Sequence, residues 1–195
     1  MKFIGFYDYT VILTYMSLIS AVAGMLLASN GRFTAAVLCL VACGICDAFD
    51  GTVARSKRNR TGDEKAFGIQ IDSLCDAVSF GVFPALLCYH MGVDSGVGYV
   101  ILCLYTLCGV IRLAFFNVQE GKRQQTEGGC NKTYRGLPIT SASIILPIVY
   151  LTRSFLPGKV YRGLLHLVMA VTGFLFVLDF SVKKPDFSKI LTRSR

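Results

Sequence analysis

Six long apolar stretches, separated by polar breaks, constrain the fold of this chain more than any other feature. A helix that crosses the hydrocarbon core of a bilayer needs about 20 mostly apolar residues. The 195 residues are 53% hydrophobic and 16% charged, with a mean hydropathy of +0.56, which is too apolar for an ordinary soluble domain. We therefore expect an all-α, polytopic membrane helix bundle. The expected spans are residues 10–28, 33–49, 67–91, 97–118, 137–151 and 160–180.

These spans leave little room for a separate soluble domain, so residues 1–195 should form a single transmembrane domain. The net charge is +8, and the basic residues concentrate in segments 55–67, 119–136 and 183–195. All three segments lie on one side of a six-helix arrangement, so the positive-inside rule places both termini in the cytoplasm. The basic residues should favour anionic membrane lipids nearby. A nucleic-acid partner is therefore unnecessary to explain the charge.

Four aspartates stand inside two consecutive spans, where ionisable residues are costly and indicate function by default. Asp47 and Asp50 lie three residues apart near the end of the second span, and Asp72 and Asp76 lie four apart near the start of the third. Helical spacing places each pair on one face. Because a short connection makes the two helices antiparallel neighbours, we expect the two faces to meet and to gather four carboxylates.

Four carboxylates cannot all remain ionised in a low-dielectric site without a counter-charge, which divalent cations supply. Oxygen ligands with no accompanying His or Cys suit hard ions such as Mg²⁺, Mn²⁺ or Ca²⁺ rather than zinc. Two ions sharing these carboxylates would resemble the two-metal arrangement of phosphoryl chemistry. The sequence therefore predicts a metal site on the cytoplasmic side, formed by Asp47, Asp50, Asp72 and Asp76.

Small residues and one arginine lie close to the acids. Gly51 and Ala54 return to within about 40° of the helix face of Asp47, which leaves open space where a nucleotide could lie. Arg55 follows and could hold a phosphate through two hydrogen bonds, and Gly68 lies one turn before Asp72. Taken singly, small residues in membrane helices most often just permit close packing.

The eight residues from Asp47 to Asp76 that carry this pattern resemble the signature of the CDP-alcohol phosphotransferase family. The signature is aspartate-x-x-aspartate-glycine-x-x-alanine-arginine followed by glycine-x-x-x-aspartate-x-x-x-aspartate, and every position matches. The segment 67–85 and the blocks beginning at Arg112 and Arg135 are similar to the integral-membrane phosphatidylserine synthases of that family. The stretch around Thr14 departs from the usual proline-asparagine pair at the entrance to the first helix.

The resemblance implies a reaction in which CDP-diacylglycerol and L-serine give phosphatidylserine and CMP, with Mg²⁺ or Mn²⁺. It implies that Asp76 takes the proton from the serine hydroxyl, and that Gly51, Ala54, Arg55 and Gly68 bind CDP-diacylglycerol. A homodimer is also implied. The carboxylate of serine needs a cation, for which Arg112 and Arg135 are candidates; a helix-pairing role for Arg112 stays open.

Two other functions remain to be separated from this one. A sister transferase could use glycerol phosphate, inositol phosphate or choline as acceptor, or an archaeal-type lipid as donor. A cation transporter or channel could also use buried carboxylates. That class predicts acids spread through the depth of the membrane and paired broken helices, whereas the four aspartates here cluster near one face.

Overall fold

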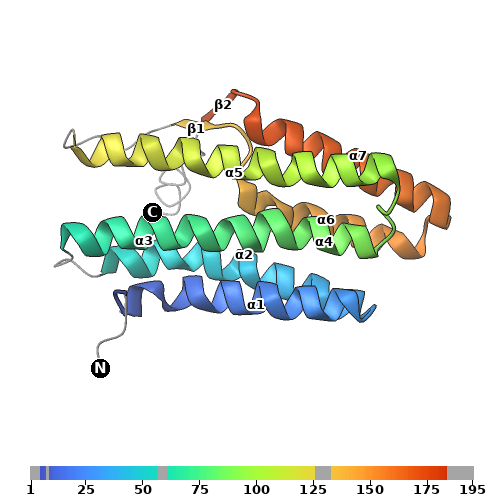
Figure 1. Ribbon diagram of the computed structural model, residues 1–195, viewed down its shortest axis with the longest axis horizontal. Coiled ribbons are helices and arrows are strands. Elements are labelled where there is room, and N and C mark those ends of the chain that lie inside the picture. The colour runs from blue at the N-terminus through green and yellow to red at the C-terminus, as the bar shows by residue number, and fades with distance from the viewer. Residues whose placement is uncertain (1–4, 8, 57–60, 126–132, 184–195) are drawn as a thin grey trace, which may run out of the picture.

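The computed structural model describes residues 5–7, 9–56, 61–125 and 133–183. Within them the chain forms six helical rods, one of which is divided by a π-helical segment (Figure 1). The helices are α1 (Ile12–Ser29), α2 (Phe33–Ser56), α3 (Gly62–Asp76) continued by α4 (Phe83–His90), α5 (Gly96–Gln125), α6 (Ala142–Leu151) and α7 (Gly158–Val177).

Five of the rods are long and apolar enough to cross a membrane, which indicates a multi-pass membrane protein and confirms the all-helical expectation. The sixth, Ile139–Ser154, is a shorter apolar helix in which α6 is flanked by two short 3-10 turns. Pro147 lies inside α6 and removes one backbone donor from it. The fifth predicted span is therefore present but is shorter and less regular than the others.

Side chains on the outside of the bundle are largely apolar. Phe155 is 86% exposed, Leu151 is 69% exposed and Val97 is 70% exposed. A soluble monomer rarely exposes so much apolar surface, whereas hydrocarbon is a suitable solvent for it. The interior is mainly apolar, and its largest fully buried side chains include Leu40, Phe80, Phe83, Leu165 and Met169.

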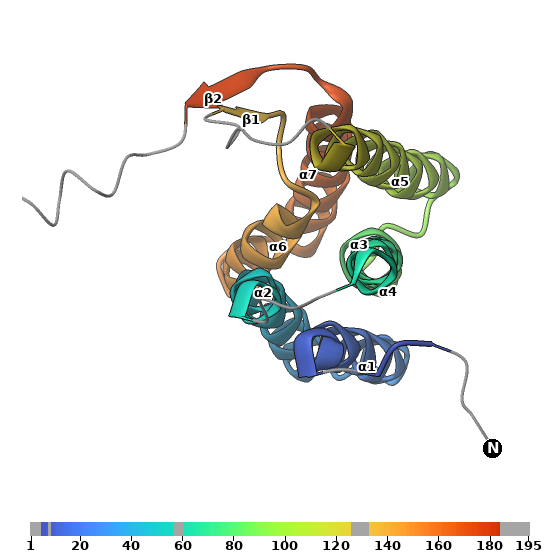
Figure 2. The ribbon, with the colours of Figure 1, turned by 90° about the vertical axis from the view of Figure 1, so that its left-hand side faces the viewer.

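Helix α1 packs along α2 and also contacts α3 and α4. Viewed end on, the helices follow one another around the bundle in the order α1, α2, α6, α7, α5 and α3–α4 (Figure 2). Small residues permit the close approaches. A Cβ added at Gly24 of α1 would overlap the ring of Phe83, and one added at Gly173 of α7 would come within 3.0 Å of the Tyr105 backbone on α5.

Two helices extend further into the basic segment 55–67 than expected. Helix α2 continues to Ser56, so Arg55 lies on a helix rather than in a loop. Helix α3 begins at Gly62, where Thr61 and Glu64 form a capping box: the Thr61 N–H donates to Glu64 at 2.8 Å, and the Glu64 N–H donates to Thr61 Oγ1 at 3.2 Å. The polar stretch between the expected spans 33–49 and 67–91 is thus helical over residues 50–56 and 62–66.

A short antiparallel ribbon was not predicted. Strand β1 (Thr133–Arg135) pairs with β2 (Ser181–Lys183), so that Arg135 lies opposite Ser181. The next residue, Gly136, has a φ of +65°, and its N–H donates to the Phe180 carbonyl at 2.7 Å. Glycine adopts this left-handed conformation without strain. The ribbon ties the segment before α6 to the segment after α7.

Candidate active site

Asp47 and Asp50 lie on α2, and both side chains are half-buried. Contacts one to two turns earlier fix the position of this helix. Ser20 Oγ of α1 donates to the Cys39 carbonyl at 3.1 Å, and Cys43 Sγ donates to the Ser17 carbonyl at 3.2 Å. On another side of α2, a Cβ at Gly44 would overlap Ser143 of α6. The first acid pair is therefore carried by a helix held between α1 and α6.

Asp72 and Asp76 lie on α3, again half-buried, and Asp76 is its last residue. Ser73 Oγ, beside Asp72, donates to Asn117 Oδ1 of α5 at 2.7 Å. Asn117 ends the block that begins at Arg112, and no role was predicted for it. A polar residue inside an apolar span was the signal that could have found it. This hydrogen bond attaches the second acid pair to α5.

The structure brings all four aspartates together. Asp76 interacts electrostatically with Asp47, Asp50 and Asp72, and Asp47 interacts with Asp72. The side chains of Asp50 and Asp72 are within hydrogen-bonding reach of one another. Carboxylates that interact in this way repel one another when ionised, and a cation between them would offset the repulsion. The prediction that the two helix faces meet is therefore supported by this geometry, although α2 and α3 each pack mainly on other elements, α1 among them.

The donor set suits a hard divalent cation, because four carboxylates offer oxygen ligands and negative charge. In the part of the chain that the structure describes, no three His, Cys, Asp or Glu side chains are arranged to hold a metal ion as they stand. The carboxylates are thus neighbours rather than a closed ligand set. Metal binding by Asp47, Asp50, Asp72 and Asp76 stays a prediction.

Two thiols accompany the carboxylates. Cys46 interacts electrostatically with Asp50, and Cys75 interacts with Asp76 and Asp72. Hard ions were expected because no His or Cys was counted among the ligands, whereas these two thiols lie close enough to interact with the carboxylates. The carboxylate oxygens still outnumber the thiols, but the choice against zinc now needs a direct test.

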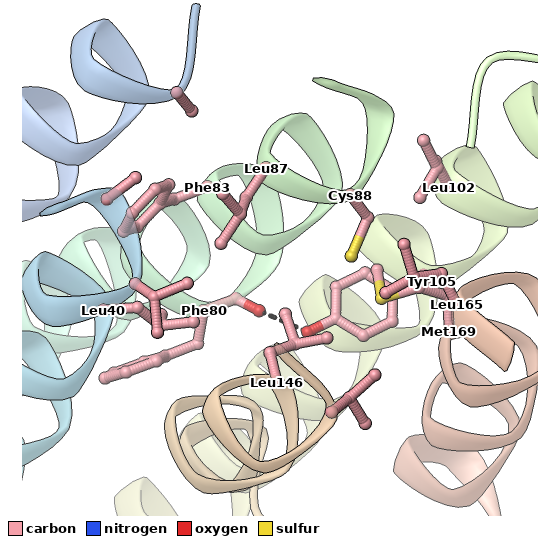
Figure 3. Close-up of a cluster of buried hydrophobic side chains, with 14 of the residues drawn as sticks. Leu40, Phe80, Phe83, Leu87, Cys88, Leu102, Tyr105, Leu146, Leu165 and Met169 are labelled. Atoms are coloured by element: carbon pink, nitrogen blue, oxygen red, sulfur yellow. Dashed lines mark hydrogen bonds between the residues drawn. The ribbon is translucent and has the colours of Figure 1, made fainter. Parts of the chain in front are cut away.

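A π-helical segment, Ala77–Val82, follows Asp76 directly. In a regular helix the Phe80 carbonyl would accept from the N–H of residue 84, but Pro84 has none. Tyr105 of α5 supplies the missing donor, because its hydroxyl donates to the Phe80 carbonyl at 2.7 Å (Figure 3). Single π turns inside helices frequently occur at functional sites. Here the π segment separates the acidic part of the rod from its apolar continuation in α4.

The residues expected to bind the nucleotide lie on the same two helices. Gly51, Ala54 and Arg55 are in the last two turns of α2, but their side chains lie outside the described part of the structure. Gly68 is half-buried on α3, one turn before Asp72. The backbone therefore places all four near the acids along the chain, while their contacts stay predictions.

Arg112 is almost completely buried, but it faces α7. Its Nη1 donates to the Phe176 carbonyl at 3.3 Å, and its guanidinium lies 4.5 Å from the centre of the Phe116 ring. It lines a cavity of about 240 Å³ between α5 and the end of α7 that also includes Asp179. Asn117 lies about 140° further around α5 by the helical period. Arg112 is thus on a different side of α5 from the residue that reaches α3.

The Arg135 backbone lies in β1, whereas its side chain is outside the described part. Its neighbour Gly136 is packed against Arg112: a Cβ there would come within 2.7 Å of Arg112 Nη1. The two arginine blocks that the sequence singled out are therefore adjacent in space. Although Asn117 of the first block reaches Ser73, no described contact joins either arginine side chain to the aspartates. Serine binding by Arg112 or Arg135 stays a prediction.

The helical rods and the shared carboxylates define a multi-pass membrane protein with an acidic site between two of its helices. Residues 9–178 match the CDP-alcohol phosphatidyltransferase family model. The chain belongs to this family, whose members are phospholipid-synthesising transferases.

Curated relatives agree with this assignment. The chain is 30% identical over 189 residues to a CDP-diacylglycerol–serine O-phosphatidyltransferase from Helicobacter pylori, covering 94% of this chain and 74% of that protein. It is 32% identical over 145 residues to the Bacillus subtilis protein of the same name, covering 73% and 70%. An archaetidylserine synthase from Methanothermobacter thermautotrophicus is 38% identical over 143 residues, which are 70% of this chain and 56% of that protein. No solved structure matches significantly.

Proposed function

We propose that this protein transfers a phosphatidyl group from CDP-diacylglycerol to L-serine, which gives phosphatidylserine and CMP. The observation that carries the proposal is the interaction of Asp47, Asp50, Asp72 and Asp76, which come from two helices. Relatives of the chain carry the name of the enzyme that catalyses this reaction. Each aspartate matches a position of the family signature. The acceptor follows from the names of the relatives.

In the proposed reaction the serine hydroxyl oxygen forms a bond to the phosphorus that carries the diacylglycerol. The bond from that phosphorus to the bridging oxygen breaks, and the bridging oxygen leaves with CMP. Asp76 accepts the hydroxyl proton, because an alcohol is a weak nucleophile at neutral pH and needs a positioned base. Mg²⁺ or Mn²⁺, when held by the four aspartates, would supply positive charge for the pyrophosphate and the departing CMP.

The remaining roles in binding the two substrates are assigned to residues near the aspartates and to the two arginine blocks. Gly51, Ala54 and Gly68 leave room for the cytidine, and Arg55 binds a phosphate through paired hydrogen bonds. Arg112 or Arg135 offsets the carboxylate of serine. The contact of Gly136 with Arg112 supports treating the two arginine blocks as one region.

We further propose that the acidic site opens to the cytoplasm. The helix ends nearest the aspartates adjoin the basic segments, which the positive-inside rule assigns to that side. Both termini would then be cytoplasmic, and water-soluble serine would reach the acids directly. A homodimer is proposed from the resemblance alone, and chemical crosslinking in the native membrane would test it.

The deciding experiment is incubation of the purified protein with CDP-diacylglycerol and, separately, serine, glycerol phosphate, inositol phosphate and choline, following CMP release. Serine should support the fastest release. Faster release with another acceptor would replace serine and keep the reaction class. If no acceptor supports metal-dependent CMP release, the transferase function is wrong and cation transport becomes the leading alternative.

A second donor is favoured by one specific observation. The relative with 38% identity is named for archaetidylserine, so an archaeal-type CDP-lipid is a candidate donor. Parallel assays with CDP-diacylglycerol and an ether-linked CDP-archaeol would separate the two. The lipid that gives the higher kcat/KM at saturating serine is the donor.

A further inference from the structure

A basic cavity lies at the end of the bundle away from the aspartates. It has a volume of about 380 Å³ and lies where α1 joins α2 and where α6 ends, at the right-hand end of Figure 1. It is lined by Gly31, Arg32, Phe33, Thr34, Ala35, Tyr150 and Arg153. The proposed transferase chemistry makes no use of it.

Ring contacts hold one of its two arginines in place. The Arg153 guanidinium lies 5.1 Å from the centre of the Phe33 ring and 5.9 Å from that of Tyr150. Tyr150 is itself fixed, because its hydroxyl and Thr34 Oγ1 are 2.8 Å apart. A stacked arginine keeps its N–H groups available for an oxyanion. The cavity is therefore a built arrangement rather than a chance meeting of flexible side chains.

The positive charge in the cavity is not neutralised within the described part of the chain. Arg153 makes the two ring contacts, and neither Arg32 nor Arg153 forms an ion pair with another described residue. The first two turns of α7, at this end, also carry Lys159 and Arg162, and the connection between α4 and α5 carries one acidic residue, Asp94. The first backbone N–H groups of α2, which point toward its N-terminus, add partial positive charge at residues 33–35. The uncompensated positive charge at this cavity would therefore favour binding of an anion.

The surroundings indicate where the anion comes from. Leu151 and Phe155, next to the cavity in sequence, are 69% and 86% exposed. Phe33 and Tyr150 lie at a helix end, where aromatic side chains favour the membrane–water interface. A ligand with a phosphate at the level of the arginines and acyl chains along the apolar surface would contact both the basic cavity and the exposed apolar side chains.

We propose that Arg32 and Arg153, with Tyr150 and Thr34, bind the phosphate of a phospholipid headgroup in the leaflet away from the aspartates. The proposal does not rest on the transferase function. It assigns this end of the bundle a lipid site that is independent of the acidic site.

The test uses the full chain purified in detergent, with short-chain dioctanoyl phosphatidylglycerol as the probe and thermal stability as the readout. The lipid should raise the Tm in a saturable manner. Arg32→Gln and Arg153→Gln should each weaken its apparent affinity about fivefold. Lys159→Gln, which removes a charge at the same end but outside the cavity, is the matched control and should change the affinity less than twofold. The Tm without lipid reports whether each variant is folded.

Two further probes identify the source of the phosphate. Dioctanoylglycerol, which lacks the phosphate, should not produce the arginine-dependent shift. Inorganic phosphate should produce little shift at concentrations where the lipid saturates. Equal shifts from inorganic phosphate would overturn the lipid assignment in favour of a free-anion site. Wild-type affinity in the Arg32→Gln, Arg153→Gln double variant, or equal loss in Lys159→Gln, would overturn the site itself.

Discussion

The Tyr105 hydroxyl donates a hydrogen bond of 2.7 Å to the Phe80 carbonyl, the group that Pro84 leaves without its regular helical donor. Both residues are almost wholly buried. The bond connects α5 to the π segment that begins one residue after Asp76. It therefore stabilises the irregular part of the rod that carries the second acid pair.

Replacing Tyr105 with Phe should leave this buried carbonyl without a partner. The expected cost is about 1–3 kcal/mol of stability, measured as thermal or denaturant unfolding in detergent. Tyr99→Phe, which alters a more exposed tyrosine on the same helix, should cost less than about 0.5 kcal/mol. Equal effects of the two variants would show that the hydrogen bond to Phe80 contributes little.

The four-carboxylate site predicts that Asp76→Asn lowers transferase activity at least about a hundredfold, as expected for loss of a general base. Asp47→Asn, Asp50→Asn and Asp72→Asn should also remove most activity, because each deletes a charge that would face the metal. Asp63→Asn changes an exposed acid in the first turn of α3 and should leave activity near wild type. Near wild-type turnover in two of the four site variants would disprove the shared site.

Removing the metal tests, independently of the variants, whether the reaction depends on a divalent cation. EDTA should stop CMP release, and Mg²⁺ or Mn²⁺ should restore it. Because Cys46 and Cys75 lie near the acids, zinc must be included in the series. Restoration by zinc alone would contradict the hard-ion assignment and point to sulfur ligands.

Close packing near the first acid pair predicts that Gly44→Ala is destabilising. The new methyl group would overlap Ser143, and overpacking of this kind costs about 1–3 kcal/mol. Ser143→Gly in the same chain should restore part of the loss, which a double-mutant cycle would measure. Gly163→Ala on α7 meets open space and should be neutral or stabilising. A loss at Gly163 equal to that at Gly44 would argue against the contact.

Serine binding predicts that Arg112→Lys or Arg135→Lys raises the KM for serine more than it lowers kcat, because a lysine does not reproduce the two-bond grip of a guanidinium on a carboxylate. The burial of Arg112 against α7 adds a control for it: the variant's unfolding transition has to match that of wild type before the KM is interpreted. An unchanged KM for serine in both variants would remove these arginines from the acceptor site and leave the aspartates unaffected.

Much of this arrangement could be predicted from apolar content and spacing. Each of the six expected spans corresponds to a helix, and five of these helices are long and apolar enough to cross a membrane. The pairing of Asp47 and Asp50 with Asp72 and Asp76 followed from helical spacing. The helix ends were missed because hydropathy falls at the edge of the bilayer although a helix can continue into the headgroup region. The Thr61 and Glu64 capping box was a readable signal for the start of α3.

Other features had no local signal. The β1–β2 ribbon has three residues in each strand, too few for a period-two pattern to emerge. The direction in which Arg112 points depends on how α5 is rotated against α7, which the sequence of α5 alone does not specify. Pro84 could have indicated an irregular helix, but the hydrogen bond that Tyr105 supplies in compensation depends on α5 lying beside the π segment.

Helix α1 contributes none of the four aspartates, yet it contacts both helices that carry them. The width of the acidic site is consequently set in part by a helix that takes no part in the proposed chemistry. At Gly24, where a Cβ would overlap Phe83, α1 and the α3–α4 rod are in direct contact and leave no room for a larger side chain. A larger side chain at position 24 would move the α3–α4 rod outward relative to α2. A residue outside the acidic site can therefore change the distance between the two acid pairs.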